Sequence, residues 1–496
     1  MENVVRYSDF GAVGDGVVND FAAIKAAHDY ANEHDLPVEG QPGRTYRLGD
    51  NGSESVIIKT DTLWVGCAFI LDDSEITYDM PARTTPLFKI TSDGNPVALE
   101  GVNSLKIGDT NIGVRVGFPA LVHVVNENQR RYIRSGLNED KGDAQREVLL
   151  VDADGNIDPS TPVSWDYDTV TKCTAHPIDD KPIDINGGHF IRWANQAPNE
   201  YYYYQRGIRI TRSNVTFRNF DHKMIKEGPT RSPYAGFLCA ELVNNLTLEN
   251  GIVRAHKHYF RQDPGGLNLL GSYEIQFGNS NRITLKNIYQ PNMYEDDDVT
   301  ILFKGEMGSN YCRNFLVDGC HLSSFDSHKG SGNITIINSE IEHINCIGVG
   351  HVHIENTIIQ MGPKPEIMTL RGDYGCIWRG TAYIKDVTLS SPKDDQDFSL
   401  MAGYGAWENW DFGYETCMPH TITISDVRTS GGRPLYIFAR YIEKYGDVSK
   451  TTLPDGTPNK NPYQPVKRVI IESNKYNVPV IVNDTPLFKD VEIIKK

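Results

Sequence analysis

The sequence lacks the motifs that mark several common enzyme classes. It has no glycine-rich phosphate loop between a strand and a helix, no G-x-S-x-G, no H-E-x-x-H and no paired cysteine and histidine spacing of the zinc type. The eight cysteines form no C-x-x-C and no compact framework. Several of them fall inside strand-like segments, where a thiol packs as a small apolar group. We therefore expect reduced, buried cysteines and no disulfides.

Basic residues are also scarce. The chain has 49 Lys and Arg against 65 Asp and Glu, a formal net charge of −16, and no basic run of the kind that binds nucleic acid. Nucleic acid is therefore not an expected partner, although a local basic groove can still bind an anionic glycan. No apolar run reaches membrane-spanning length, and the first residues show no signal-peptide pattern. We expect a soluble monomer or homo-oligomer; a secreted, periplasmic or cytoplasmic location all stay open.

A short phrase that alternates apolar and polar side chains recurs along the chain. Three consecutive copies end at Gly319, Asn338 and Asn356, which lie 19 and then 18 residues apart. Alternation predicts a strand, and Gly and Asn tolerate the left-handed backbone of a tight corner. Further copies end at Asn219, Asn250, Asn287, Asp386 and Asp426. The repeat predicts an all-β fold, a right-handed parallel β-helix of about ten coils.

The most distinctive motif is residues 5–20, VRYSDFGAVGDGVVND. This segment resembles the N-terminal motif of the pectate-lyase-like β-helix superfamily, which includes pectinases, glycoside hydrolases, polysaccharide lyases and tailspike-type proteins. The resemblance implies the fold, whereas the chemistry varies among hydrolases, lyases, epimerases and binders. The apolar periodicity after Asp20 predicts a helix near 20–32, with Asp20 as its N-cap, that covers one end of the solenoid.

Breaks in the repeat divide the chain into four predicted regions. They are an N-terminal cap with the first coils (1–90), an inserted β-rich subdomain (91–200), the main β-helix with its active-site loops (201–430), and a C-terminal coil and tail (431–496). The insertion is predicted because hairpin-like strands with Asp-Gly and Asp-Pro turns replace the solenoid phrase. Nothing in it indicates catalysis. A later loop, 396–418, is rich in Trp and Tyr and suited to stacking on sugar rings.

Residues at equal offsets after each corner should align on successive coils. This count brings the polar segments 254–259, 294–298 and 326–329 to one side of the predicted helix. The candidates chosen from them are Asp326 and His328 for catalysis, and Lys329, His256, Lys257, His258 and Asp297 for substrate binding. The acidic run Asp296–Asp298 has two other interpretations, a solvated turn or a weak, hydrated Ca²⁺ site. We predict no other cofactor. If the reaction is hydrolysis, activity should survive a chelator, whereas its loss with rescue by Ca²⁺ would favour a lyase.

A second cluster follows the predicted strand at 367–370. Arg371, Asp373, Tyr374 and Trp378 together form a plausible saccharide subsite, with a bidentate cation, an acid or base, and stacking rings. The competing interpretation is an ordinary ion pair between Arg371 and Asp373 within one turn.

Two reactions on a polysaccharide or oligosaccharide fit these residues, and the favoured one is inverting glycoside hydrolysis. Asp326 and Asp373 would be the two carboxylates, with His328 orienting Asp326. Three coils at about 4.8 Å per strand spacing would separate the carboxylates too far for a retaining pair. Among the polygalacturonase relatives, the resemblance implies an Asp-Asp pair, a Gly-His-Gly and an Arg-x-Lys. Here Asp297-Asp298, His328 and Arg371 follow that order only loosely.

The alternative reaction is β-elimination by a polysaccharide lyase acting on a uronic-acid polymer. Arg371 or Ca²⁺ would neutralise the uronate, His328 or Lys329 would take the proton, and Tyr374 would protonate the leaving group. A third class, a non-catalytic glycan-binding β-helix of the tailspike type, needs no close carboxylate pair.

Overall fold

The structure is a computed structural model of the chain. It describes residues 4–49, 52–136, 139–197, 203–227, 232–254, 259–263, 266–270, 272–291, 305–360, 366–391, 397–403, 410–444, 450–452, 455–459 and 462–496, without the side chains of 259–263, 266–270 and 305–306. Two compact units divide the chain. The first contains 1–96, 176–308 and 321–323, and the second contains 97–175, 309–320 and 324–496.

In the first unit, parallel strands stack in two sheets. One sheet contains β6 (Thr62–Asp72), β12 (Ile183–Trp193), β14 (Val215–Arg218), β17 (Asn244–Glu249) and β22 (Asn281–Lys286). The other contains β5 (Val56–Ile58), β7 (Phe88–Ile90), β13 (Ile208–Ile210), β16 (Leu238–Glu241) and β21 (Ser272–Gly278). Each strand pairs in parallel with the next, so one coil follows another along the axis.

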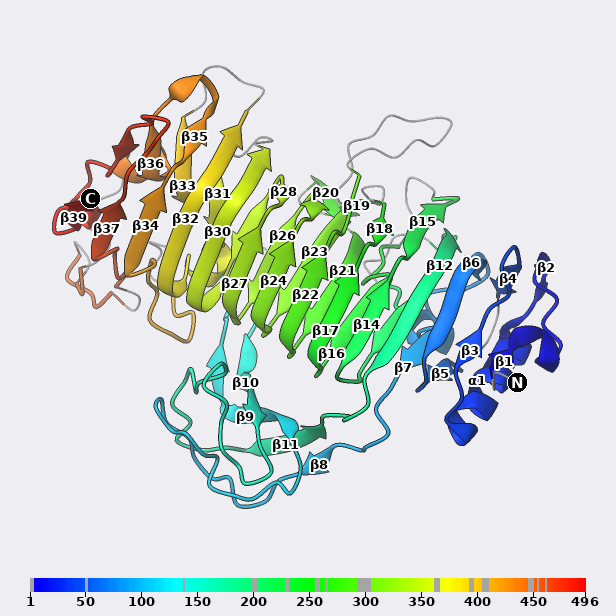
Figure 1. Cartoon of the computed structure of the whole chain (residues 1–496). Helices are drawn as coiled ribbons and strands as arrows, with labels where there is room; N and C mark the ends of the chain where they lie inside the picture. Colours follow the sequence, from blue (N-terminus) through cyan, green and yellow to red (C-terminus); the bar gives the residue numbers. More distant parts are fainter. Residues whose placement is uncertain are drawn as a thin grey trace. The chain divides into compact units, whose positions relative to one another are not determined.

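The second unit repeats this arrangement (Figure 1). One sheet contains β24 (Arg313–Asp318), β27 (Ser331–Ile337), β30 (Gly348–Gln360), β32 (Trp378–Ser390), β34 (Thr421–Ser425), β37 (Arg468–Ile471) and β39 (Glu492–Lys495). The other contains β26 (Phe325–Lys329), β29 (Ile344–Cys346), β31 (Glu366–Leu370), β33 (Phe398–Ala402), β36 (Leu435–Phe438) and β38 (Val480–Ile481). The predicted right-handed parallel β-helix is confirmed.

The corners form as the repeat predicts. All eight predicted corner residues have a positive φ, between 47° and 65°. Their polar side chains add a ladder of hydrogen bonds from coil to coil: the Asn338 amide donates to Asp318 Oδ1 at 2.8 Å, and the Asn356 amide donates to Asn338 Oδ1 at 2.8 Å. The short polar residues at these positions therefore relieve backbone strain and also link neighbouring coils.

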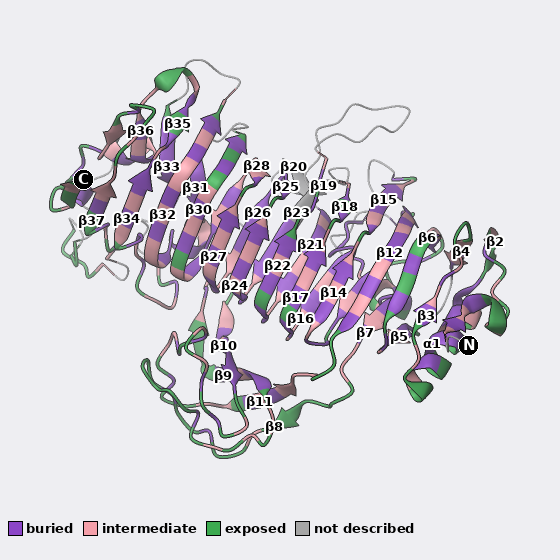
Figure 2. Ribbon diagram, viewed as in Figure 1, coloured by how far each residue is buried: buried purple, intermediate pink, exposed green. Residues whose placement is uncertain are grey.

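Aligned aliphatic side chains fill the interior of the second unit. Ile336, Ile354, Ile384 and Ile424 are directly paired across four successive strands, and all four are buried. Figure 2 shows the resulting alternation of buried and half-buried bands along β27 and β30. Burying one such side chain stabilises a fold by roughly 1.5–3 kcal/mol, so register is strongly fixed here.

Helix α1 (Phe21–His34) packs on β1 (Val5–Arg6), β3 (Val38–Glu39) and β5. Asp20 is the N-cap residue, as predicted, but its side chain does not cap the helix. Its carboxylate accepts no bond from the first helical turn but accepts the backbone N–H groups of Val13 (2.7 Å) and Gly14 (3.1 Å). The preceding Asn19 instead accepts the Phe21 N–H at 3.2 Å. Asp20 therefore shapes the turn of the N-terminal motif.

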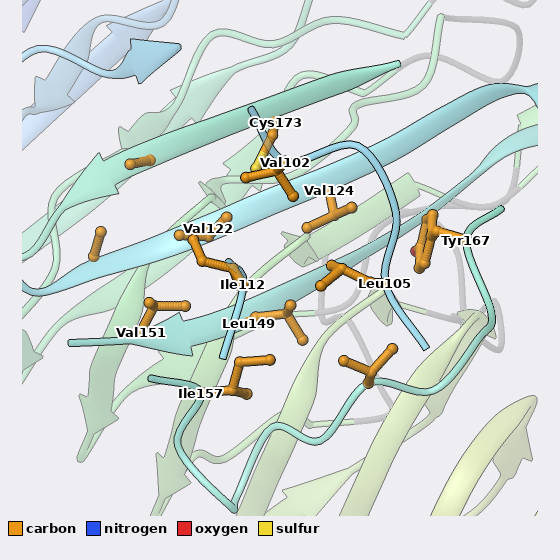
Figure 3. Close-up of a cluster of buried hydrophobic side chains, with 13 residues drawn as sticks. Val102, Leu105, Ile112, Val122, Val124, Leu149, Val151, Ile157, Tyr167 and Cys173 are labelled. Atoms are coloured by element: carbon orange, nitrogen blue, oxygen red, sulfur yellow. The ribbon is translucent and has the colours of Figure 1, made fainter. Parts of the chain in front are cut away.

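The second unit also contains an antiparallel sheet, in the order β10 (Asp143–Val151), β9 (Ala120–Arg131), β11 (Lys172–Pro177), β8 (Val97–Ala98). Its own apolar cluster, drawn in Figure 3, includes Val122, Val124, Leu149 and Tyr167. By residue 183 the chain has already entered β12 of the solenoid. The inserted sheet therefore has a separate core, and its hairpin β9–β10 carries residues to the candidate site.

All eight cysteines are free, and six of them are buried, as expected. Among the described helices, none is long and apolar enough to cross a membrane.

Candidate active site

The candidate site is built on strand β26 of the second unit. Phe325 is buried and packs edge-on against Phe315, so alternation along the strand turns Asp326 and His328 to the opposite face. Asp326 is nevertheless only 3% exposed. Its Oδ2 lies 3.0 Å from His328 Nδ1, whereas its buried Oδ1 has no hydrogen-bond partner among the described residues. The strand therefore holds a carboxylate and an imidazole as a dyad.

Nitrogen Nδ1 of His328 has two competing partners. It lies 3.0 Å from Asp326 Oδ2 and 2.7 Å from Arg371 Nη1. A guanidinium only donates, so Nδ1 accepts from Arg371 when it carries no proton and donates to Asp326 when it does. When the neutral ring carries its proton on Nδ1, Nε2 is unprotonated and can accept a proton. No described residue donates a hydrogen bond to Nε2. The dyad can therefore supply a general base at Nε2.

Arg371 joins this dyad to the second predicted carboxylate. It directly follows β31 and precedes the 3-10 turn η3 (Gly372–Tyr374). Its Nε and Nη2 donate to Asp373 at 3.1 and 2.7 Å, and its Nη1 lies 3.6 Å from Asp326 Oδ2. One guanidinium thus separates the two carboxylates. Only β29 lies between β26 and β31, so they are two strand steps apart and not the three that we predicted.

A further arginine comes from the inserted sheet. Arg134 follows β9, and its Nε lies 2.9 Å from Asp373 Oδ2, while the backbone N–H of Ser135 donates to the Asp373 carbonyl at 2.9 Å. Asp373 is thus paired with two guanidinium groups. We did not predict this contribution from the insertion, because the pairing depends on a contact between residues 239 positions apart.

Both carboxylates are more acidic than usual. For Asp326, burial acts to raise the pKa, but the hydrogen bond from His328 and the charges of His328 and Arg371 outweigh it and lower the pKa. For Asp373, burial is likewise outweighed by the hydrogen bond and charge of Arg371 and by the charge of Arg134, so its pKa is also lowered. Both groups are ionised at neutral pH. Neither is held as the carboxylic acid that paired-carboxylate hydrolysis requires.

Tyr374 and Trp378 do not form the predicted stacking wall. Trp378 is fully buried and donates its indole N–H to the Gly350 carbonyl at 3.2 Å. Tyr374 is only 1% exposed, because Arg134, Lys329 and Arg371 surround its ring, each with its charged group within 5.8 Å of the centroid. Burial raises the pKa of the Tyr374 hydroxyl, so it stays protonated.

The predicted substrate contact Lys329 is also engaged within the protein. Its ammonium donates to Asp143 Oδ2 at 3.2 Å, and the Tyr311 hydroxyl donates to the same oxygen at 2.6 Å. Asp143 opens β10, so this contact fixes the second strand of the hairpin to the solenoid wall. Three cations (Arg134, Lys329, Arg371) therefore face three carboxylates (Asp143, Asp326, Asp373).

The aromatic loop at 396–418 makes internal contacts where it is described. The Trp410 indole donates to the Ile133 carbonyl at 3.2 Å, and the Tyr414 hydroxyl donates to the Tyr374 carbonyl at 2.7 Å. Phe412 is buried. These rings hold the hairpin and the η3 turn together. Sequence reasoning missed Arg134 and Asp143. The basic run QRRYIR at 129–134 was an available signal for Arg134.

Four predicted contacts, His256, Lys257, His258 and Asp297, lie outside the described residues, as does the acidic run Asp296–Asp298. Among the residues that are described, no three His, Cys, Asp or Glu side chains group as a metal site.

No family model and no curated protein matches the sequence. Solved structures with the same fold include the tailspike gp61 of Pseudomonas phage phi297, which is 12% identical over 98% of this chain and 78% of that chain, with a TM-score of 0.51. The gp54 tailspike of Acinetobacter baumannii bacteriophage AP22, in complex with A. baumannii capsular saccharide, is 10% identical over 97% of this chain and 69% of that chain, with a TM-score of 0.50. At such identities the likeness shows a shared parallel β-helix fold.

Proposed function

We propose that the protein is a glycan-cleaving enzyme and that His328, held by Asp326, is its proton-transfer group. The observation that carries this proposal is the shared Nδ1 of His328, which lies within hydrogen-bond distance of both Asp326 and Arg371. Only the Nδ1–H tautomer leaves Nε2 free as a base, and the buried Asp326 carboxylate stabilises that tautomer. The β-helix tailspike in complex with a capsular saccharide supports a glycan as substrate.

The favoured reaction is β-elimination at a uronic acid residue. His328 Nε2 takes the C5 proton, the C5 electron pair forms the C4=C5 double bond, and the C4–O bond to the leaving sugar breaks. The leaving oxygen is protonated by water, because Tyr374 is only 1% exposed. Arg134 and Arg371, whose guanidinium groups lie beside the Tyr374 ring close to His328, would neutralise the uronate carboxylate and stabilise the charge that develops on it.

Inverting hydrolysis is the second candidate, because of the spacing of the two carboxylates. Two strand steps of about 4.8 Å place Asp326 and Asp373 near the separation of roughly 6.5–9.5 Å that inverting pairs use. It ranks second because the lowered pKa of both groups leaves neither as a general acid.

A panel of acidic and neutral polysaccharides tests both reactions. New reducing ends together with absorbance from unsaturated uronates support elimination, and reducing ends alone support hydrolysis. If no polymer is cleaved although one binds, the glycan-binding alternative replaces both. A chelator should leave the rate unchanged, because arginines supply the positive charge; loss of activity with rescue by Ca²⁺ would contradict this and shift the role to Asp296–Asp298.

His328→Gln tests the proton-transfer role. Turnover should fall by roughly 10²–10⁴, because general acid–base catalysis contributes about that factor. The control is His353→Gln: His353 lies on β30, where its ring bonds to Glu355 and not to the dyad. Wild-type turnover in His328→Gln, or an equal loss in the control, would refute the assignment.

A further inference from the structure

A pocket separate from the candidate active site lies between the inserted sheet and the solenoid part of the second unit. It has a volume of about 520 Å³, within the usual range for small-molecule sites. Its lining includes Arg131 and Trp165 from the insertion, and Arg379, Tyr414 and Lys467 from the solenoid part. None of the site carboxylates lines it.

The centre of this pocket is an indole with two guanidinium groups. The guanidinium carbon of Arg131 lies 4.7 Å from the Trp165 ring centroid, and that of Arg379 lies 4.4 Å from it. Backbone carbonyls fix both cations: Arg131 donates to Gly413, and Arg379 donates to Ser164. Gln145 further accepts from Arg131 Nε at 3.1 Å. Two like charges are therefore held against one ring.

Neither arginine has a carboxylate partner within 4 Å among the described residues, whereas most arginines at the candidate active site are ion-paired. Asp166 and Glu415 also line the pocket, but Asp166 Oδ1 accepts the Ile107 N–H at 2.8 Å and Glu415 is exposed. Burial, with a further contribution from the charge of Arg379, lowers the pKa of Arg131. The positive charge of the two arginines is therefore not paired with a carboxylate at contact distance among the described residues.

We infer that this pocket binds an acidic sugar, with the sugar carboxylate between Arg131 and Arg379. Guanidinium groups bind carboxylates with paired hydrogen bonds, and the pocket gives room for a pyranose ring as well as its charge. Tyr414 and the edge of Trp165 offer apolar surface to that ring. The inference rests on the proposed function only in taking the ligand to be a saccharide. The pocket would then be a non-catalytic site, separate from the candidate active site, that anchors an acidic polymer.

Calorimetric titration with glucuronate tests the inference, because this monosaccharide has no glycosidic bond and cleavage cannot contribute. The full-length protein should bind glucuronate, and Arg379→Gln should weaken binding by roughly tenfold or more, the usual effect of losing a charged hydrogen bond. Arg440→Gln is the matched control, since Arg440 is an exposed arginine that pairs with Asp397. Arg379→Gln removes the hydrogen bond to the Ser164 carbonyl and the cation contact with Trp165, and its melting temperature checks the fold.

Glucose and inorganic sulfate complete the test. Weak or absent binding of both supports an acidic-sugar site. The inference would be overturned if glucose or sulfate bound as tightly as glucuronate. It would also be overturned if Arg379→Gln bound glucuronate as tightly as the wild type does. His328→Gln should bind glucuronate normally even when it cleaves no polymer. Loss of binding there would place the ligand in the active site and also overturn the inference, whatever the outcome for cleavage.

Discussion

At the scale of single residues, the site depends on how one imidazole nitrogen is shared. His328 Nδ1 cannot bond to Asp326 and Arg371 with the same proton arrangement, so the charge on Asp326 selects the tautomer. Asp326 is too buried to contact a polymer directly. In the proposed elimination Asp326 would therefore position His328, whereas the sequence suggested it as a general acid or base.

Asp326→Asn tests that role. We expect turnover to fall by orders of magnitude with a smaller change in KM, because the amide no longer stabilises the base tautomer. Stability should also fall, by about 1–3 kcal/mol, because a buried charged hydrogen bond is lost. Urea denaturation and steady-state kinetics measure the two effects. If Asp326→Asn keeps wild-type turnover, the Asp326 carboxylate has a structural role only.

The lowered pKa of Asp326 and of Asp373 predicts acid sensitivity. Groups with a folded pKa below their ordinary value of 3.8 stabilise the fold above that value and lose this contribution as the pH falls through the folded pKa. The free energy of unfolding should therefore drop as the pH falls from about the ordinary value of 3.8 through the lowered folded pKa values. Asp373→Asn should show a smaller drop than Asp397→Asn, a control at another carboxylate flanked by two arginines. Equal drops would contradict the prediction.

At the scale of elements, the corners were predictable because each is a local property. A residue that closes a strand phrase must adopt positive φ, and all eight predicted positions do. The strand alternation was equally local, so Asp326 and His328 were correctly placed on one face. Their neighbours were not predictable, because Arg134 reaches Asp373 through a hairpin that the repeat does not specify. Counting coils also failed by one step, and of the two strands only the one at 367–370 was predicted, because 326–329 was taken as a polar segment and not as strand β26.

The corner at Asn338 provides a test of this local account. Its φ is 52°, and it bonds to Asp318 and Asn356. Asn338→Gly keeps the backbone conformation and loses the ladder, whereas Asn338→Val adds strain of about 1–2 kcal/mol for the left-handed backbone. We expect Val to lower the melting temperature more than Gly does. The reverse order would show that the ladder and not the backbone conformation dominates.

At the scale of the whole molecule, the net charge of −16 opposes the approach of an acidic polymer. The cations that would bind such a polymer are partly buried, either balanced by carboxylates at the candidate site or gathered at the Arg131–Arg379 pocket. The arginines therefore attract an acidic polymer at short range, whereas the net negative charge repels it at long range. Varying the salt concentration distinguishes the two effects, because the long-range repulsion is screened first. The Debye length falls from about 30 Å at about 10 mM to about 8 Å at about 150 mM.

If the substrate is acidic, kcat/KM should rise as salt increases over this range, because the long-range repulsion is screened while contacts with half-buried arginines weaken less. A neutral polymer that is cleaved should show no comparable change. Arg379→Gln should keep the upward trend, since the total charge becomes only more negative, but from a lower starting value. A steep fall of kcat/KM with salt in the wild type would mean that electrostatic attraction speeds substrate binding. That result would contradict the prediction that the net charge of the protein repels the substrate.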